Sequence, residues 1–227
     1  MEKKYELTQE TINFKSRVLH RIRALKDFAN VKAGDLGGWI ESERNLSDYG
    51  ESWVADEAKV HGDAEISGDA KICGDAKVCG NAAVYGGAMV CGNARIFDYA
   101  NIGDNARIFG NAEIYDNARV YDYVEIYGNA RVSGSACVSN NAQVYGDARI
   151  YGDAEIFGDA KIYGDAKVYG SAAVYDNAIV HGDVRIYGDA EISGDAKICG
   201  HTKVSDDAGI HGEVDITEDT PVRGEIY

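Results

Sequence analysis

Five histidines are the side chains in this sequence best suited to general acid–base chemistry. They are His20, His61, His181, His201 and His211. No Asp or Glu can be assigned to any of them from the sequence as an orienting partner, so the sequence does not predict a general base. His61 and His181 take a position that is aromatic elsewhere in the chain, which indicates a structural role.

Five cysteines are the candidates for nucleophilic, redox or metal chemistry: Cys73, Cys79, Cys91, Cys137 and Cys199. Their number is odd, and they lack the CxxC or Cys/His spacing of metal and redox sites. We interpret them as occupants of repeat positions that elsewhere hold Tyr, Ser, His or Phe, except Cys137, whose position is usually charged. Phosphate-binding loops and hydrolase motifs are also missing. The sequence therefore predicts no catalytic residue, no metal site and no cofactor.

A six-residue repeat organises the chain from Val54 to Val222. Every sixth residue there is Ile or Val, over 29 consecutive positions, and a typical unit reads Ile-Tyr-Gly-Asp-Ala-Lys. The Ala two residues before each aliphatic residue shares its face of a short strand. The residue two after it tolerates positive φ, which predicts a corner in every repeat. Where this corner residue is not Gly it is usually Asp or Asn: Asp98, Asp104, Asp116, Asp122, Asn140, Asp176 and Asp206.

These strand-and-corner units resemble those of the hexapeptide-repeat proteins, whose fold is a left-handed parallel β-helix. The resemblance implies the handedness and a triangular coil of three repeats, whereas the spacing alone indicates strand, corner and register. The predicted fold class is all-β, a left-handed parallel β-helix of nine to ten coils with a small N-terminal β cap.

The first 53 residues differ in composition from the repeats. Apolar and basic residues alternate from Ser16 to Leu25, and a Gly-rich turn follows at 34–39. We expect two or three strands that cover the open end of the helix. Ile40 and Leu46 are six apart but two residues out of phase with Val54, so the helix begins imperfectly near residue 38. The predicted organisation is a cap at 1–53, the helix at 54–222 and a tail at 223–227.

The segment KDFANVKAGDLGGWIESERNLSDYGESWVADEA carries a more specific resemblance, which covers residues 22–72. It is similar to the start of the YdcK-type hexapeptide proteins of bacteria, which also occur in phages and are classed as acyltransferases by their fold. Catalytic hexapeptide proteins place a His and an acyl-carrier pocket between subunits, helped by an inserted loop and a C-terminal extension. No insertion interrupts the repeats of this chain, which favours binding over catalysis.

The net charge is −15, and residues 1–53 hold nine basic and nine acidic residues, so the repeats carry the whole excess. An acidic rod repels nucleic acid and anionic membranes, so direct nucleic-acid binding is not expected. No apolar run suggests a membrane span or a signal peptide. We expect a cytoplasmic protein, in the host cytoplasm if it is phage-encoded.

With three repeats per coil, one outward column is cationic in eight of nine coils. These candidate partner-binding residues are Lys59, Lys77, Arg95, Arg131, Arg149, Lys167, Arg185 and Lys203, and Glu113 is the exception. The simplest interpretation is a solvated ion-pair ladder, because Asp75, Asp147, Asp165 and Asp183 precede four of the cations by two residues. Asn takes that place before Arg95 and Arg131, which therefore lack a carboxylate on the same strand and are the better binding candidates.

Aromatic residues follow most of the aliphatic residues in the middle of the chain and should stack at the corners. A carbohydrate or nucleobase platform is the alternative use of such rings. We select Tyr145 and Tyr163 from this set as further candidate partner-binding residues.

The leading hypothesis is a non-catalytic scaffold or interaction protein that binds a macromolecular partner through its charged face. One version is a phage-type inhibitor whose acidic surface occupies a basic site on a host protein. The alternatives are an acyltransferase that uses acyl-coenzyme A at a subunit interface, and small-ligand sequestration between subunits. We expect a homotrimer, in which the cationic column meets the face bearing Glu65, Glu155 and Glu191.

Overall fold

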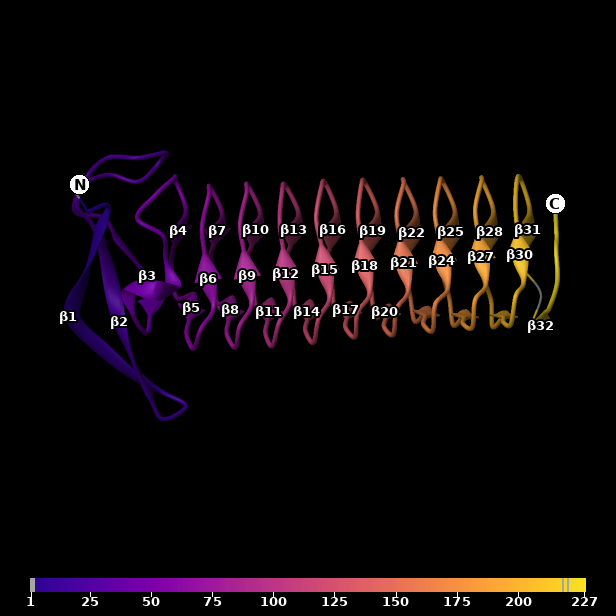
Figure 1. Cartoon of the computed structure of the whole chain (residues 1–227), viewed down its shortest axis with the longest axis horizontal. Helices are drawn as coiled ribbons and strands as arrows, with labels where there is room; N and C mark the ends of the chain where they lie inside the picture. Colours follow the sequence, from indigo (N-terminus) through magenta and orange to yellow (C-terminus); the bar gives the residue numbers. More distant parts are fainter. Residues whose placement is uncertain (1–2, 218, 220) are drawn as a thin grey trace.

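The computed structural model describes residues 3–217, 219 and 221–227, and these form a straight rod of stacked coils with a β hairpin at its N-terminal end (Figure 1). Residues 18 apart pair in parallel, so three strands and three corners complete each coil. The rod is thus a three-sided parallel β-solenoid, and the fold class predicted from the sequence is confirmed.

The first face, which we call the cationic sheet, has 13 strands in the described residues and includes the hairpin. Its strands are β1 (Tyr5–Phe14), β2 (Arg17–Ala24), β3 (Leu36–Ile40), β5 (Lys59–Val60), β8 (Lys77–Val78), β11 (Arg95–Ile96), β14 (Glu113–Ile114), β17 (Arg131–Val132), β20 (Arg149–Ile150), β23 (Lys167–Val168), β26 (Arg185–Ile186), β29 (Lys203–Val204) and β32 (Pro221–Val222).

The second sheet has ten strands in the part of the chain that the structure describes. They are β4 (Trp53–Val54), β7 (Lys71–Ile72), β10 (Met89–Val90), β13 (Arg107–Ile108), β16 (Glu125–Ile126), β19 (Gln143–Val144), β22 (Lys161–Ile162), β25 (Ile179–Val180), β28 (Lys197–Ile198) and β31 (Asp215–Ile216).

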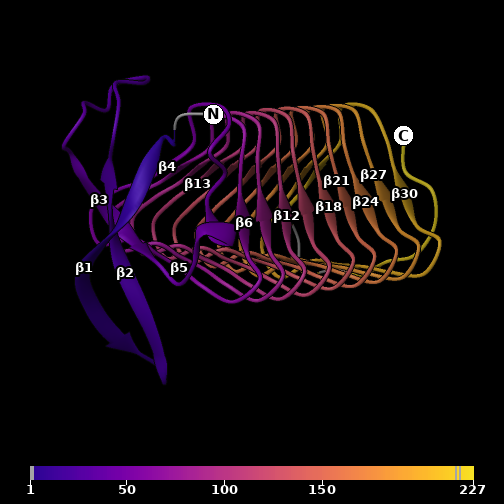
Figure 2. The same ribbon diagram turned by 60° about the vertical axis from the view of Figure 1, so that its left-hand side comes forward.

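The third sheet has nine strands among the same described residues, and Figure 2 shows them as one row along the rod. They are β6 (Glu65–Ile66), β9 (Ala83–Val84), β12 (Asn101–Ile102), β15 (Arg119–Val120), β18 (Cys137–Val138), β21 (Glu155–Ile156), β24 (Ala173–Val174), β27 (Glu191–Ile192) and β30 (Gly209–Ile210). A 3₁₀ turn, η1 (Glu43–Asn45), precedes β4.

The core of the rod consists of the Ala and the Ile or Val of each repeat. Ala130 and Val132 illustrate the pattern, since both are completely buried while Arg131 between them is exposed. Each buried Ile or Val contributes about 1.5–3 kcal/mol of hydrophobic stabilisation. Backbone amides and carbonyls of successive coils hydrogen-bond to one another. For example, the amide of Arg131 donates to Ala148 O at 2.9 Å, and equivalent bonds occur along all three sheets.

The corners use the backbone conformation that the sequence predicted. All seven Asp and Asn residues predicted at corners have φ between 52° and 64°. At Gly128, with φ 72°, a Cβ atom would lie 2.9 Å from Gly146 N of the next coil, so close stacking also favours glycine there. Corner aspartates also accept hydrogen bonds from the next coil: Asp116 Oδ2 accepts one from the amide of Gly134 at 3.0 Å. Part of the acidic excess therefore has a structural origin.

The first coil contains two extra residues, as the phase of Ile40 and Leu46 predicted. Ile40 pairs with Val60 and Leu46 with Ile66, both 20 residues apart. The side chain of Asn45 in η1 connects this longer coil to the next one. Its amide nitrogen donates to two carbonyls of the next coil, at 3.0 and 2.9 Å, and its oxygen accepts two amides of its own turn.

The predicted N-terminal strands form an antiparallel sheet, in which β1 pairs with β2 and β2 with β3. β3 then pairs in parallel with β5, which joins the hairpin to the cationic sheet. Lys4 secures the start of β1, because its completely buried ammonium donates to Ser52 O at 2.9 Å and to Ser52 Oγ at 3.1 Å. The Tyr5 hydroxyl donates to Leu46 O at 2.8 Å.

Candidate functional site

The predicted cationic column exists as one line of outward side chains on the cationic sheet. Parallel pairing places Arg131 directly beside Arg149, and Arg149 beside Lys167. Lys167 pairs in turn with Arg185, and the next strand carries Lys203. Like charges on neighbouring strands repel one another, so this line needs either counter-charges or a ligand.

Glu113 supplies the counter-charge for the middle of the column. Its carboxylate lies 2.7 Å from Arg95 Nη1 and 3.2 Å from Arg131 Nε, on the strands to either side. The sequence predicts that these two arginines lack a carboxylate on their own strand, and the carboxylate that both contact belongs to the strand between them. Both arginines therefore already have a counter-charge.

The N-terminal hairpin covers the first two cations. Phe14 lies at the end of β1, and its ring centroid is 5.8 Å from Lys59 Nζ and 6.0 Å from Lys77 Nζ. The same ring lies 5.5 Å from the imidazole of His61, whose pKa is lowered by burial and by Arg17. The cap thus closes the N-terminal end of the column by cation–π contacts.

The C-terminal half of the column has no such partner. Among the described residues, no carboxylate oxygen lies within 4.0 Å of the cationic groups of four successive members: Arg149, Lys167, Arg185 and Lys203. The predicted ion-pair ladder with Asp75, Asp147, Asp165 and Asp183 was wrong. These aspartates belong to the corners, where Asp147 accepts the amide nitrogen of Asn129 at 3.0 Å. Four neighbouring cations are therefore available to a ligand.

Aromatic rings form parallel stacks along the corners, as predicted. The continuous ladder runs through one corner with centroids 4.7–5.0 Å apart and contains both rings selected from the sequence: Phe109, Tyr127, Tyr145, Tyr163 and His181. Burial and the neighbouring phenols raise the pKa of Tyr145. This ladder lies at a different corner from the one that follows the cationic column.

The corner that follows the cationic column carries an interrupted ladder. Phe97 stacks on Tyr115, and Tyr151 stacks on Tyr169 and then Tyr187. The intervening position holds Ser133, and a pocket of about 310 Å³ opens there. Its lining is Tyr115, Arg131, Ser133, Arg149, Ile150, Tyr151 and Lys167. Sequence reasoning missed this site, although an 18-residue alignment of the corner positions shows one Ser within a row of rings.

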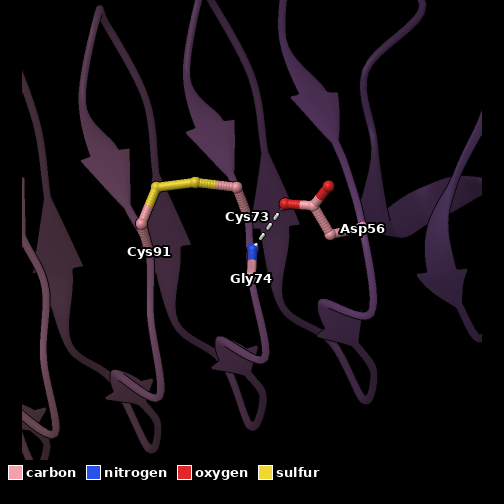
Figure 3. Close-up of a disulfide and its surroundings, with 4 residues drawn as sticks. All are labelled: Asp56, Cys73, Gly74 and Cys91. Atoms are coloured by element: carbon pink, nitrogen blue, oxygen red, sulfur yellow. Dashed lines mark hydrogen bonds between the residues drawn. A yellow bond between two sulfur atoms is a disulfide. The ribbon is translucent and has the colours of Figure 1, made fainter.

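Two cysteines form a disulfide that the sequence interpretation did not predict. Cys73 and Cys91 lie 18 residues apart at the same corner of successive coils, with Cα atoms 4.6 Å apart, and their sulfurs are bonded (Figure 3). The amide of the neighbouring Gly74 donates to Asp56 Oδ2 at 2.8 Å. The signal for this pair was the coil length itself, since stacked positions meet the distance that a disulfide requires.

One histidine has the carboxylate that could not be assigned from the sequence. The His211 ring lies with Nδ1 2.8 Å from Ser193 Oγ and with Nε2 3.3 Å from Glu225 Oε2. His201 lies 3.5 Å from Asp183. The structure therefore supplies two carboxylate partners that could not be assigned from the sequence. Glu225 follows the last strand and returns to β30, where Ile226 pairs with Ile210.

In the described part of the chain, no group of three or more His, Cys, Asp or Glu side chains is placed to hold a metal ion. The same residues include no helix that is long and apolar enough to cross a membrane.

Comparison with known proteins finds a family match within the repeats. A family profile described as the YdcK beta solenoid repeat matches residues 126–140 and 142–159. The chain is also similar to the uncharacterized acetyltransferase YdcK of Escherichia coli K12, with 35% identity over 66 residues. The matched segment is 26% of this chain and 20% of the E. coli protein, so it spans about a fifth of that relative.

Comparison with solved structures finds matches, among them two at low identity. One is the UDP-N-acetylglucosamine acyltransferase of Francisella novicida, at 15% identity and a TM-score of 0.45, with 75% of this chain and 62% of that chain covered. The other is the UDP-N-acetylglucosamine O-acyltransferase LpxA of Moraxella catarrhalis, at 14% identity and a TM-score of 0.28, with 76% and 65% covered. We infer no function from either. The protein is a parallel β-solenoid that resembles the YdcK-type hexapeptide-repeat proteins, as its first coils and its repeats had indicated.

Proposed function

We propose that this protein is a non-catalytic interaction protein, a rigid acidic rod that binds an acidic patch of a protein partner through its cationic sheet. The observation that carries the proposal is the run of four cations from Arg149 to Lys203 without a carboxylate within 4.0 Å among the described residues. Like charges on neighbouring strands repel one another, and an acidic partner would relieve that repulsion.

The test is a pull-down in which the charge of this line is reversed. The variant Arg149→Glu/Lys167→Glu/Arg185→Glu should lose a partner that the original protein retains at low salt. The matched control Arg107→Glu/Lys161→Glu/Lys197→Glu reverses three outward cations on the second sheet and should keep the partner. If only the control loses the partner, binding uses the other faces. That result would favour the version in which the acidic surface occupies a basic site on a host protein.

A homotrimer is the alternative use of the cationic column. In a ring of three parallel copies the column would meet the third sheet, which carries Glu65, Glu155 and Glu191. Light scattering at low salt tests it, and a monomer would contradict it.

An acyltransferase is the second candidate, and one arrangement favours it. His211 has both a hydroxyl and a carboxylate at hydrogen-bonding distance, which is the arrangement of a base held by an orienting group. The similar E. coli protein also bears the name acetyltransferase. A reproducible thermal shift with acetyl-coenzyme A, lost in His211→Asn, would favour this function over the interaction protein. A shift with nucleotides that requires the oligomer would instead favour ligand sequestration between subunits.

A further inference from the structure

The interrupted ladder lacks one ring in an otherwise regular stack. Rings on adjacent coils of this corner are parallel, with centroids 4.7–5.2 Å apart. Tyr115 and Tyr151 are two coils apart and each stacks on the ring away from the gap, so each has one ring face without a stacked neighbour. Their separation is about twice the ladder step, which leaves room for one flat ring between them.

The position of Ser133 explains why the gap stays open. Ser133 is buried, so its small side chain forms the floor of the pocket and does not fill it. Filling the place from the same corner would require a side chain of aromatic size. The continuous ladder at the neighbouring corner shows that such rings fit, since Tyr145 stacks on Tyr127 and Tyr163 at 4.7 and 4.8 Å.

The walls of this pocket are strongly positive. Arg131, Arg149 and Lys167 line it together with the two tyrosines, and none of its described lining residues carries a carboxylate. Glu113 neutralises Arg131 from the side away from Arg149. Arg149 and Lys167 have no carboxylate within 4.0 Å in the described chain, so they remain for a ligand. A guanidinium and an ammonium group on neighbouring strands suit a phosphate group.

We propose that this pocket binds a nucleoside monophosphate, whose base takes the place of the missing ring and whose phosphate is held by Arg149 and Lys167. A flat base supplies the stacking surface for Tyr115 and Tyr151. The phosphate supplies the negative counter-charge that Arg149 and Lys167 lack. The volume of about 310 Å³ lies at the small end of the range for ligand pockets, which suits a single nucleotide. A long polyanion is disfavoured, because the rest of the rod is acidic.

This proposal shares Arg149 and Lys167 with the protein interface proposed above but does not require that partner, and calorimetry with AMP tests it. We expect AMP to bind, and adenosine and ribose 5-phosphate to bind at least ~10-fold more weakly, because each offers only half of the recognised chemistry. Ser133→Tyr should weaken AMP binding at least ~10-fold, since the new ring occupies the place of the base. The same substitution at the adjoining corner, Ser139→Tyr, should leave it unchanged. Arg149→Gln should weaken it, whereas Arg119→Gln on the third sheet should not.

The melting temperature of Ser133→Tyr gives a second readout. A gap of ring size predicts an unchanged or higher Tm, because the ladder is completed, and a lower Tm would show that no ring fits there. Failure of AMP to bind at ~10 mM, equal binding of ribose 5-phosphate, or unchanged AMP binding by Ser133→Tyr would each overturn the proposal. Tighter binding of a ten-nucleotide oligo(dT) than of AMP would replace the mononucleotide with a single strand.

Discussion

The N-terminal cap and the coils are held together in opposite ways. In the coils the same contacts recur, so that Ile126 stacks between Ile108 and Val144 as its counterparts do in every other coil. In the described part of the cap, each contact joins a particular set of residues and is not repeated elsewhere. The buried Lys4 ammonium binds Ser52, and the Trp39 indole donates to Glu57 at 2.9 Å.

This difference determines what a departure from the pattern means. In the coils most positions are explained by strand, corner and stacking, so a residue that breaks the repeat has another reason to be there. Ser133, Glu113 and the Cys73–Cys91 pair are such residues. The cap offers no repeat for comparison, and its special residues are recognised only by their contacts.

Removing a core side chain from a coil should have the largest effect. Ile126 is completely buried, so Ile126→Ala should lower the free energy of unfolding by about 2–5 kcal/mol. Ile162 occupies the equivalent place two coils on, and Ile162→Ala should cost the same within about 0.5 kcal/mol. Guanidinium unfolding measures both. A difference well above that value would show that the coils are not energetically equivalent.

Removing the disulfide should have the next largest effect. Cys73 and Cys91 enclose a loop of 18 residues, for which chain entropy predicts about 3 kcal/mol of stabilisation. Cys73→Ser should therefore lower the Tm of the oxidised protein, and reductant should lower the Tm of the original protein equally. Cys199→Ser, at the same corner but with a free thiol, is the control. A thiol assay on the denatured, unreduced protein that finds five thiols would contradict the disulfide.

Most of the fold was predictable because each element depends on a local rule. The residue type fixes the corner, as the positive φ of Asp98 and Asn140 shows, and the period of six fixes which residues are buried. Even the two extra residues of the first coil followed from the phase of Ile40. The handedness and triangular section came from the resemblance, because the spacing alone does not determine them.

The site was less predictable, because its contacts join residues of different coils. Glu113 reaches one strand up and one strand down, and Phe14 folds from the hairpin over Lys59 and Lys77. Glu225 returns from the C-terminal segment to His211. Only a direct alignment of residues 18 apart could have indicated the first of these, and the other two depend on segments outside the repeat.

The buried Lys4 of the cap should make stability rise with pH. Burial lowers the pKa of Lys4 from 10.5 to about 8, so between these values the unfolded chain binds more protons and stability rises with pH. We expect a gain of about 1–2 kcal/mol from pH 8 to 9.5, which Lys4→Met should abolish. Denaturant unfolding at each pH measures it. The range stops below pH 10 because burial raises the pKa of Tyr5, which opposes the trend at higher pH. An equal slope in both proteins would contradict the assignment.

The smallest effect tests whether stacked rings act as nearest neighbours. Tyr145 stacks on a ring at each side, whereas Phe109 begins the same ladder and stacks on Tyr127 alone. Each aromatic pair contributes about 0.5–1.5 kcal/mol beyond its burial, so Tyr145→Ala should cost more than Phe109→Ala by about one such contact. Thermal and denaturant unfolding of the two variants measure the difference. Because both residues occupy the same corner position, equal costs would mean that the rings stabilise the rod by covering its surface and not by stacking. The gap at Ser133 would then offer a base no more than any other exposed apolar surface.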